Sequence, residues 1–199
     1  MNPRTLSALS LLNDLKHTAF EAMERRHKYP ALLLLYSFID ICASVSDVKP
    51  PSKTNRTCFE SYLKRYALLN WGKFLPYDLW AARSSLLHTY SPLGDHTKKP
   101  NGAKPIFYFA WPETEDELRD SLLSRGYSNF ILLDIQAIKH IAISSFNAMW
   151  SHIENDAEFE ANFQANSEHL LKDLFQNKLE QELTEMDELI NLNQKSIDS

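Results

Sequence analysis

The sequence predicts a mainly α protein: an up-and-down helical bundle with a small two-stranded β ribbon and a C-terminal amphipathic helical extension. Only 4 glycines occur in 199 residues, which disfavours an all-β chain with many tight turns. Apolar residues recur at helical spacing along most of the chain. Two short segments, 105–111 and 130–134, are instead rich in β-forming residues and can pair as the ribbon.

Two helices are expected in the N-terminal part. Over residues 5–27, apolar side chains recur with a helical period and polar residues fill the positions between them. Pro30 falls in the first turn of the next helix, where proline is tolerated. That helix covers residues 31 to about 46 and is apolar nearly all round, so we expect it to be the central, buried helix. Asp40 is the exception within it.

The rest of the chain predicts further helices around the ribbon. The Pro50-Pro51 pair ends the central helix and begins a basic linker. The remaining helices are expected at 57–70, at 76 to 88–90, at 114–125 between the two strands, at 135–154, and from 157 onward. The last of these is expected to break near Asn166-Ser167, to start again at Ser167 and to fray at 191–199. We therefore divide the chain into a helical domain, residues 1–155, and an acidic amphipathic tail, residues 156–199.

Charge is unevenly distributed along the chain. Residues 49–104 contain ten lysines and arginines against three acids, while residues 151–199 contain twelve acids against three lysines. A basic middle favours an anionic partner. The alternatives are that each region is a solvated face, or that the two regions attract each other.

The expected location is the cytoplasm, without membrane insertion. The N-terminus leads into an amphipathic stretch and not into a signal peptide, and the longest apolar run, residues 31–36, is too short to cross a bilayer. Cys42 and Cys58 stand alone and are interpreted as reduced structural thiols. No histidine or carboxylate cluster has metal-ligand spacing and no nucleotide-binding glycine motif occurs, so no metal or cofactor is expected.

One helix carries a pattern that points to chemistry. Within the helix that begins near Pro76, Arg83 and His88 are separated by four residues, and Thr89-Tyr90-Ser91-Pro92 closes the segment. This pattern, after a strongly apolar helix that includes residues 36–40, resembles the HEPN superfamily, whose signature is R-x4-6-H. The resemblance covers roughly residues 5–155. In one respect the chain departs from active HEPN nucleases, which often carry an amide, an acid or a histidine where this chain has Ser84.

The resemblance implies metal-independent RNA cleavage in a homodimer. Arginine offers a permanent charge and a donor fork for phosphate oxygens, and histidine exchanges protons near neutral pH. Arg83 would stabilise charge on the transition state, and His88 would assist attack by the ribose 2′-hydroxyl or protonate the leaving oxygen. Five residues along a helix turn through roughly 140° and rise about 7.5 Å, so the two side chains do not share one face. In the HEPN family, dimerisation places both copies of the motif in one cleft.

The neighbouring polar residues have open interpretations. Arg83 can pair with Asp40 or Asp78, and Asp40 then orients the arginine or forms a core salt bridge. His88 can also serve as a partner of the helix dipole. Tyr90 is a helix cap or a phosphate contact. Lys98 and Lys99, with His96, can follow an RNA backbone or form a solvated loop.

Three functions are considered. The leading one is a HEPN endoribonuclease, in a toxin or antiviral role, with a protein antitoxin or regulator as a further partner. The second is a non-catalytic HEPN module that binds RNA, a nucleotide or a protein. The third is a structural interaction protein whose acidic tail, residues 157–199, docks on a partner, covers the basic cleft or extends the dimer interface.

Overall fold

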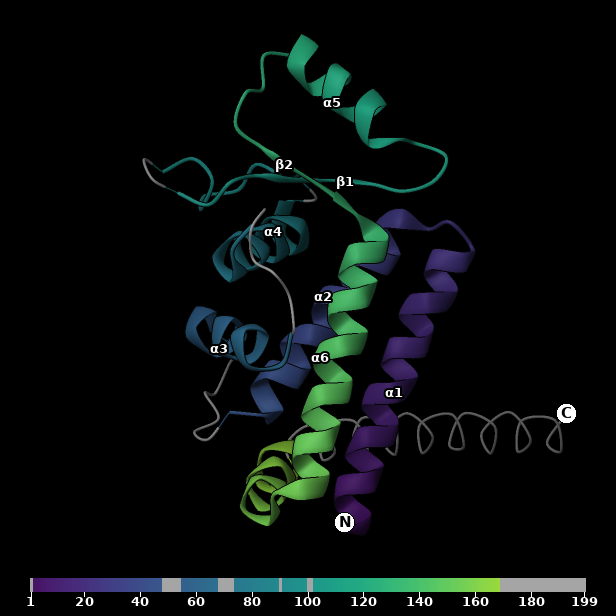
Figure 1. Ribbon diagram of the computed structural model, residues 1–199, viewed down its shortest axis with the longest axis vertical. Helices are drawn as coiled ribbons and strands as arrows, with labels where there is room; N and C mark the ends of the chain where they lie inside the picture. Colours follow the sequence, from purple (N-terminus) through teal and green to yellow (C-terminus); the bar gives the residue numbers. More distant parts are fainter. Residues whose placement is uncertain (1, 48–54, 68–73, 90, 100–101, 169–199) are drawn as a thin grey trace, which may run out of the picture.

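The computed structural model describes residues 2–47, 55–67, 74–89, 91–99 and 102–168. The elements are α1 (Pro3–Glu24), α2 (Lys28–Val45), α3 (Arg56–Tyr66), α4 (Pro76–Thr89), β1 (Ile106–Phe109), α5 (Glu115–Ser124), β2 (Ile131–Asp134) and α6 (Ile135–Asn155), followed by a helix at residues 157–168. The long helices lie side by side, and the strands with α5 lie at one end (Figure 1). The predicted mainly helical fold with a small two-stranded sheet is confirmed.

Helix α2 is the centre of the bundle, as predicted. It packs against α1, α3, α4 and α6. Its side chains Leu32, Leu35, Tyr36 and Phe38 are completely buried. By length and composition α2 is apolar enough to cross a membrane, with a mean hydropathy of 1.3, and 56% of it is buried by the rest of the protein. Core helices of soluble proteins have the same properties, so α2 decides nothing about the location of the protein.

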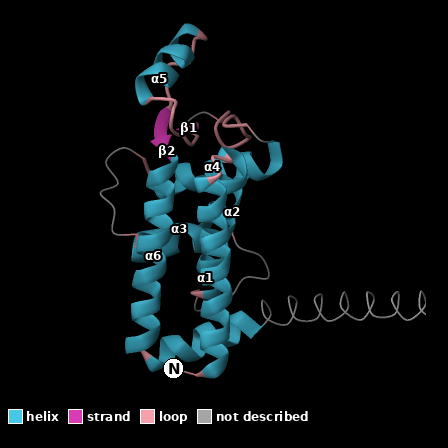
Figure 2. Cartoon of the chain, turned by 90° about the vertical axis from the view of Figure 1, so that its right-hand side faces the viewer, coloured by secondary structure: helices cyan, strands magenta, loops and turns pink. Residues whose placement is uncertain are grey.

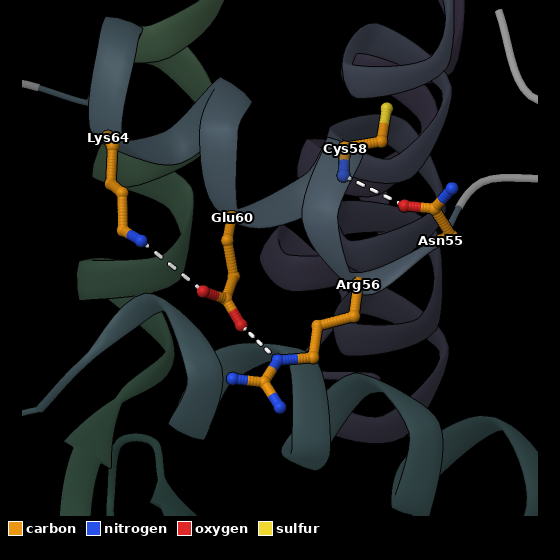
Figure 3. Close-up of polar contacts among 5 residues, drawn as sticks. All are labelled: Asn55, Arg56, Cys58, Glu60 and Lys64. Carbon is orange, nitrogen blue, oxygen red and sulfur yellow. Dashed lines mark hydrogen bonds and ion pairs between the residues drawn. The ribbon is translucent and has the colours of Figure 1, made fainter.

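Local hydrogen bonds explain where several helices begin. Asn2 caps α1 by accepting a hydrogen bond from the Arg4 amide at 2.9 Å. Asn55 caps α3 in the same way, accepting from the Cys58 amide at 3.0 Å (Figure 3). The end of α3 was predicted wrongly: the helix stops at Tyr66 and not at residue 70, because Ala67 has extended backbone angles of −81° and 102°.

The two strands pair in parallel, with Ile106 opposite Ile131 and Phe109 opposite Asp134. A parallel pair needs a crossover connection, and α5 supplies it. Figure 2 shows α5 above the strands, at the far end of the molecule from the N-terminus. Helix α6 begins directly after β2, so the small sheet is continuous with the bundle.

The helix at residues 157–168 packs against the bundle. Phe163 is completely buried and Phe159 is 6% exposed. The Asn166 side-chain amide donates hydrogen bonds to the Val45 and Asp47 carbonyls at the end of α2, at 3.2 and 2.5 Å. The predicted break near Asn166-Ser167 is therefore wrong: this helix runs through to residue 168, and Ser167 bonds back to the Gln164 carbonyl at 3.0 Å and does not begin a helix. The domain boundary at 155–156 stays a prediction, and residues 169–199 lie outside the described residues.

Both cysteines are free and buried, as predicted for structural thiols. The Cys58 thiol donates a hydrogen bond to the Ala43 carbonyl at 3.0 Å. Burial raises the pKa of Cys58 to about 12 and also raises the pKa of Cys42. Because thiolates are the reactive species, we expect neither thiol to react with an aromatic disulfide reagent at pH 8 in the native protein. Both should react once denaturant is added; rapid reaction of one thiol without denaturant would contradict the buried placement.

Candidate functional site

Arg83 lies in the middle of α4 and points toward the core. Its Nη2 forms an ion pair and a short hydrogen bond with Oδ2 of Asp40 on α2. The two side chains are only 18% and 12% exposed. The Arg83 guanidinium also lies 5.0 Å from the ring centroid of Trp80, one helical turn earlier. Of the two carboxylates considered as partners from the sequence, the structure therefore pairs Arg83 with Asp40.

The Arg83–Asp40 pair joins α2 to α4. Burial raises the pKa of the Asp40 carboxyl, and the charge and hydrogen bond of Arg83 oppose that rise. A carboxylate in this position is tolerated only with a charged partner, since an unpaired buried charge is costly. The pair therefore has a structural role in addition to any part in chemistry.

Asp78 has a different role, at the start of α4. Its Oδ2 accepts a hydrogen bond from the Leu75 amide at 2.8 Å, and its Oδ1 accepts one from the Lys104 amide at 2.9 Å. The side chain is buried. Asp78 thus fixes the first turn of α4 and holds the segment that leads into β1 against it.

His88 is exposed in the last turn of α4 and lines a pocket of ≈ 220 Å³. Ser84 lines the same pocket, as expected for residues four apart on one helix face. Among the described residues, the lining set does not include Arg83, which agrees with the angular offset expected from the five-residue separation. Among the residues that the structure describes, those that line the pocket are Ser84, Ser85, His88, Leu93, Gly94, Asp95, His96 and Lys98.

The predicted site residues therefore lie in different places: in the pocket, in the ion pair between α2 and α4, and at the start of α4. His88, Ser84 and Lys98 line one pocket. Arg83 and Asp40 form the buried pair beside it, and Asp78 lies at the opposite end of α4. Lys99 is exposed, and Tyr90 lies outside the described residues.

The loop that closes the pocket is packed onto α4. A Cβ atom at Gly94 would lie 2.0 Å from the Ser85 Oγ and 3.0 Å from the Ser85 Cβ, so a side chain at this position would require Ser85 to move. The Ala103 amide donates to the His96 carbonyl at 3.1 Å, which closes the loop. A Cβ at Gly102 would lie 2.3 Å from that same carbonyl oxygen. These close contacts hold the loop backbone around Gly94 and His96 near α4, while the Lys98 and Lys99 side chains are exposed, as in the solvated-loop alternative.

An edge-to-face aromatic contact also positions His96. Its imidazole meets the edge of the Tyr77 ring, with centroids 6.2 Å apart and planes at 81°. The Arg56 guanidinium lies 3.8 Å from the centroid of the Tyr77 ring. Arg56 is in turn paired with Glu60 at 2.5 Å, and Glu60 with Lys64 at 3.3 Å (Figure 3). A chain of contacts thus links α3 through the start of α4 to the pocket.

From the sequence, His96 was expected to contact an RNA backbone or to lie in a solvated loop. Its place in the same pocket as His88 was not predicted, because the two residues belong to different segments. The available signal was the Ser91-Pro92 turn, which reverses the chain directly after α4 and returns the following residues to the end of that helix.

Other aromatic and histidine side chains have structural environments. Phe107 on β1 is partly buried and packs edge-on against Tyr127 and Phe130. His152 is hydrogen-bonded to the Tyr66 hydroxyl at 2.7 Å and stacks on Phe159. Within the ranges that the structure describes, no group of three or more histidine, cysteine, aspartate or glutamate side chains is arranged to hold a metal ion.

Comparisons with family models, with curated proteins and with solved structures find no match to this chain. The HEPN resemblance therefore stays a prediction that rests on the Arg83–His88 pattern and its helical context.

Proposed function

We propose that this protein is a metal-independent endoribonuclease of the HEPN type that acts as a homodimer. The observation that carries the proposal is the position of His88: an exposed imidazole at the end of α4, in a pocket with Lys98 and Ser84. Histidine can transfer protons near neutral pH, and lysine can bind a phosphate. RNA cleavage by its own 2′-hydroxyl needs these two functions and no metal ion.

The dimer gives Arg83 its part in the proposal. Within one chain, Arg83 faces Asp40 while His88 faces solvent, so the two do not converge. A two-fold axis beside α4 would bring two copies of the motif to one cleft, where the exposed part of each guanidinium adds positive charge. Asp40 would then hold each arginine in place.

The proposal is tested by cleavage of single-stranded RNA by the purified protein in EDTA. We expect His88→Ala to lower the cleavage rate by about 10²–10⁴-fold, the usual contribution of a general acid or base. The matched control is His140→Ala, which removes an exposed histidine on α6, far along the chain, and should leave the rate unchanged. Equal rates for wild type and His88→Ala, or no cleavage by wild type at all, would refute the proposal.

The alternative is a HEPN module that binds RNA without cutting it. The burial of Arg83 against Asp40 favours this alternative, since a guanidinium already paired offers fewer donors to a phosphate. In that case RNA binding weakens as salt rises and no product forms at any salt concentration.

A further inference from the structure

The pocket at the end of α4 contains two imidazoles that come from different parts of the chain. His88 belongs to the last turn of the helix, and His96 to the loop that folds back onto it. Both line the same small pocket. Ribose 2′-hydroxyl attack needs one group that removes a proton and a second that supplies one, and two histidines can fill both roles near neutral pH.

Protonation of one histidine favours an anionic ligand in the pocket. Lys98 and Asp95 also line the pocket, and their opposite charges offset each other. One protonated imidazole then makes the pocket net positive, and this is the protonation state in which one histidine is an acid and the other a base.

The loop side of the pocket is held in place by packing. Gly94 lies against Ser85, Gly102 against the His96 carbonyl, and the Tyr77 ring contacts the His96 imidazole. A catalytic group held in this way lowers a barrier because it need not reorganise during the reaction. The pocket volume of ≈ 220 Å³ is below the roughly 300–1,000 Å³ of pockets that hold drug-sized ligands. It therefore suits a single phosphate with its sugar.

We propose that His88 and His96 of one chain are the proton-transfer pair of the ribonuclease, with Lys98 as the phosphate contact. This assignment rests on the function proposed above and makes His96 a second catalytic residue. One histidine takes the proton from the ribose 2′-hydroxyl as the 2′-oxygen bonds to phosphorus. The other gives a proton to the 5′-oxygen as its bond to phosphorus breaks. The products are a 2′,3′-cyclic phosphate and a free 5′-hydroxyl, and no electron donor or acceptor is consumed.

The kinetic test compares His88→Gln, His96→Gln and the control His140→Gln in the RNA cleavage assay. Loss of either pocket histidine should slow cleavage by about 10²-fold or more. The double variant should be little slower than each single variant, because the two residues act as a unit. Thermal unfolding should confirm that all variants are folded. Full activity of His96→Gln beside an inactive His88→Gln would refute the pairing while leaving the ribonuclease proposal intact.

A binding test separates the two proposals. Histidine ring signals are followed by NMR while inorganic phosphate, and separately uridine 3′-monophosphate, is added to the wild-type protein. The signals of His88 and His96 should shift together and saturate at the same ligand concentration, while His140 should not move. Lys98→Ala should weaken binding, whereas Lys139→Ala on α6 should not. Shifts without any RNA cleavage would refute catalysis but retain a phosphate site; absence of shifts at both histidines would refute the site itself.

Discussion

Replacing Arg83 with methionine is expected to lower the free energy of unfolding by about 3–5 kcal/mol. The reason is the Asp40 carboxylate, which is 12% exposed and has Arg83 as its ion-pair partner. Methionine keeps much of the side-chain volume against Trp80 but removes the positive charge. The measurement is chemical denaturation at pH 7, followed by tryptophan fluorescence.

A double variant and a surface control sharpen this prediction. Arg83→Met combined with Asp40→Leu should recover most of the lost stability, because the carboxylate that Arg83 balances is removed together with it. Arg119→Ala breaks an exposed ion pair with Glu115, at 46% and 42% exposure, and should cost about 1 kcal/mol or less. If Arg83→Met cost no more than Arg119→Ala, the buried pair would not have the structural role assigned to it.

The cost of Arg83→Met should also depend on pH. Burial raises the pKa of Asp40 in the folded protein, so the folded state binds this proton more tightly than the unfolded chain does. Asp40 therefore makes stability fall as pH rises from about 4, the ordinary aspartate value, through its raised value. In the Arg83→Met variant, the charge and hydrogen bond of Arg83 no longer oppose the rise in the pKa of Asp40. We therefore expect the stability of the variant to fall more steeply with pH than that of the wild type. We expect the gap between wild type and Arg83→Met to narrow below about pH 4, where Asp40 is protonated in both states.

Deleting residues 157–199 is expected to destabilise the whole domain. The deletion removes Phe159 and Phe163 from the core and the Asn166 hydrogen bonds from the end of α2. Burial of two phenylalanines contributes about 3–6 kcal/mol in total, which is a large part of the 5–15 kcal/mol typical of a domain. A large drop in Tm is the expected result.

A second truncation provides the control for this deletion. A chain ending at residue 168 keeps the helix that packs on the bundle, so its Tm should be close to that of the full chain. Phe163→Ala in the full chain should cost about 3–5 kcal/mol, as for other phenylalanines removed from cores. Equal Tm values for both truncations and the full chain would show that residues 157–168 contribute nothing to the core. Removing residues 169–199 alone therefore tests the part of the acidic tail that follows the packed helix.

Much of the fold is predictable from local patterns in the sequence. The apolar period of α1, the all-round apolar surface of α2 and the β-forming runs of both strands identify these elements directly. The parallel direction of the strands is not contained in their short sequences, because it depends on α5 crossing between them. The helix break predicted at Asn166 was wrong because a local pattern does not show distant contacts. The Asn166 side chain donates hydrogen bonds to carbonyls more than a hundred residues away in the sequence, and it lies within a helix.

The candidate site was only partly predictable, because some of its contacts join residues that are far apart in the sequence. A buried carboxylate in α2 requires a charged partner, so the Asp40–Arg83 pair was one of few options. Asp78 was the other candidate partner of Arg83. It does not pair with Arg83, and its two carboxylate oxygens accept hydrogen bonds from the Leu75 and Lys104 amides. The approach of His96 to the His88 pocket depends on close backbone packing of Gly94 on α4.

The most direct test of the proposed function compares two oligonucleotides of identical sequence, one with ribose and one 2′-O-methylated throughout, in EDTA. The wild-type protein should cut only the ribose form, leaving a 2′,3′-cyclic phosphate, because the 2′-hydroxyl is the attacking group. His88→Ala, confirmed to be folded by its unchanged Tm, should cut neither. Cleavage of both oligonucleotides, cleavage by His88→Ala at the wild-type rate, or survival of the ribose form with wild-type protein would each contradict a ribonuclease centred on this pocket.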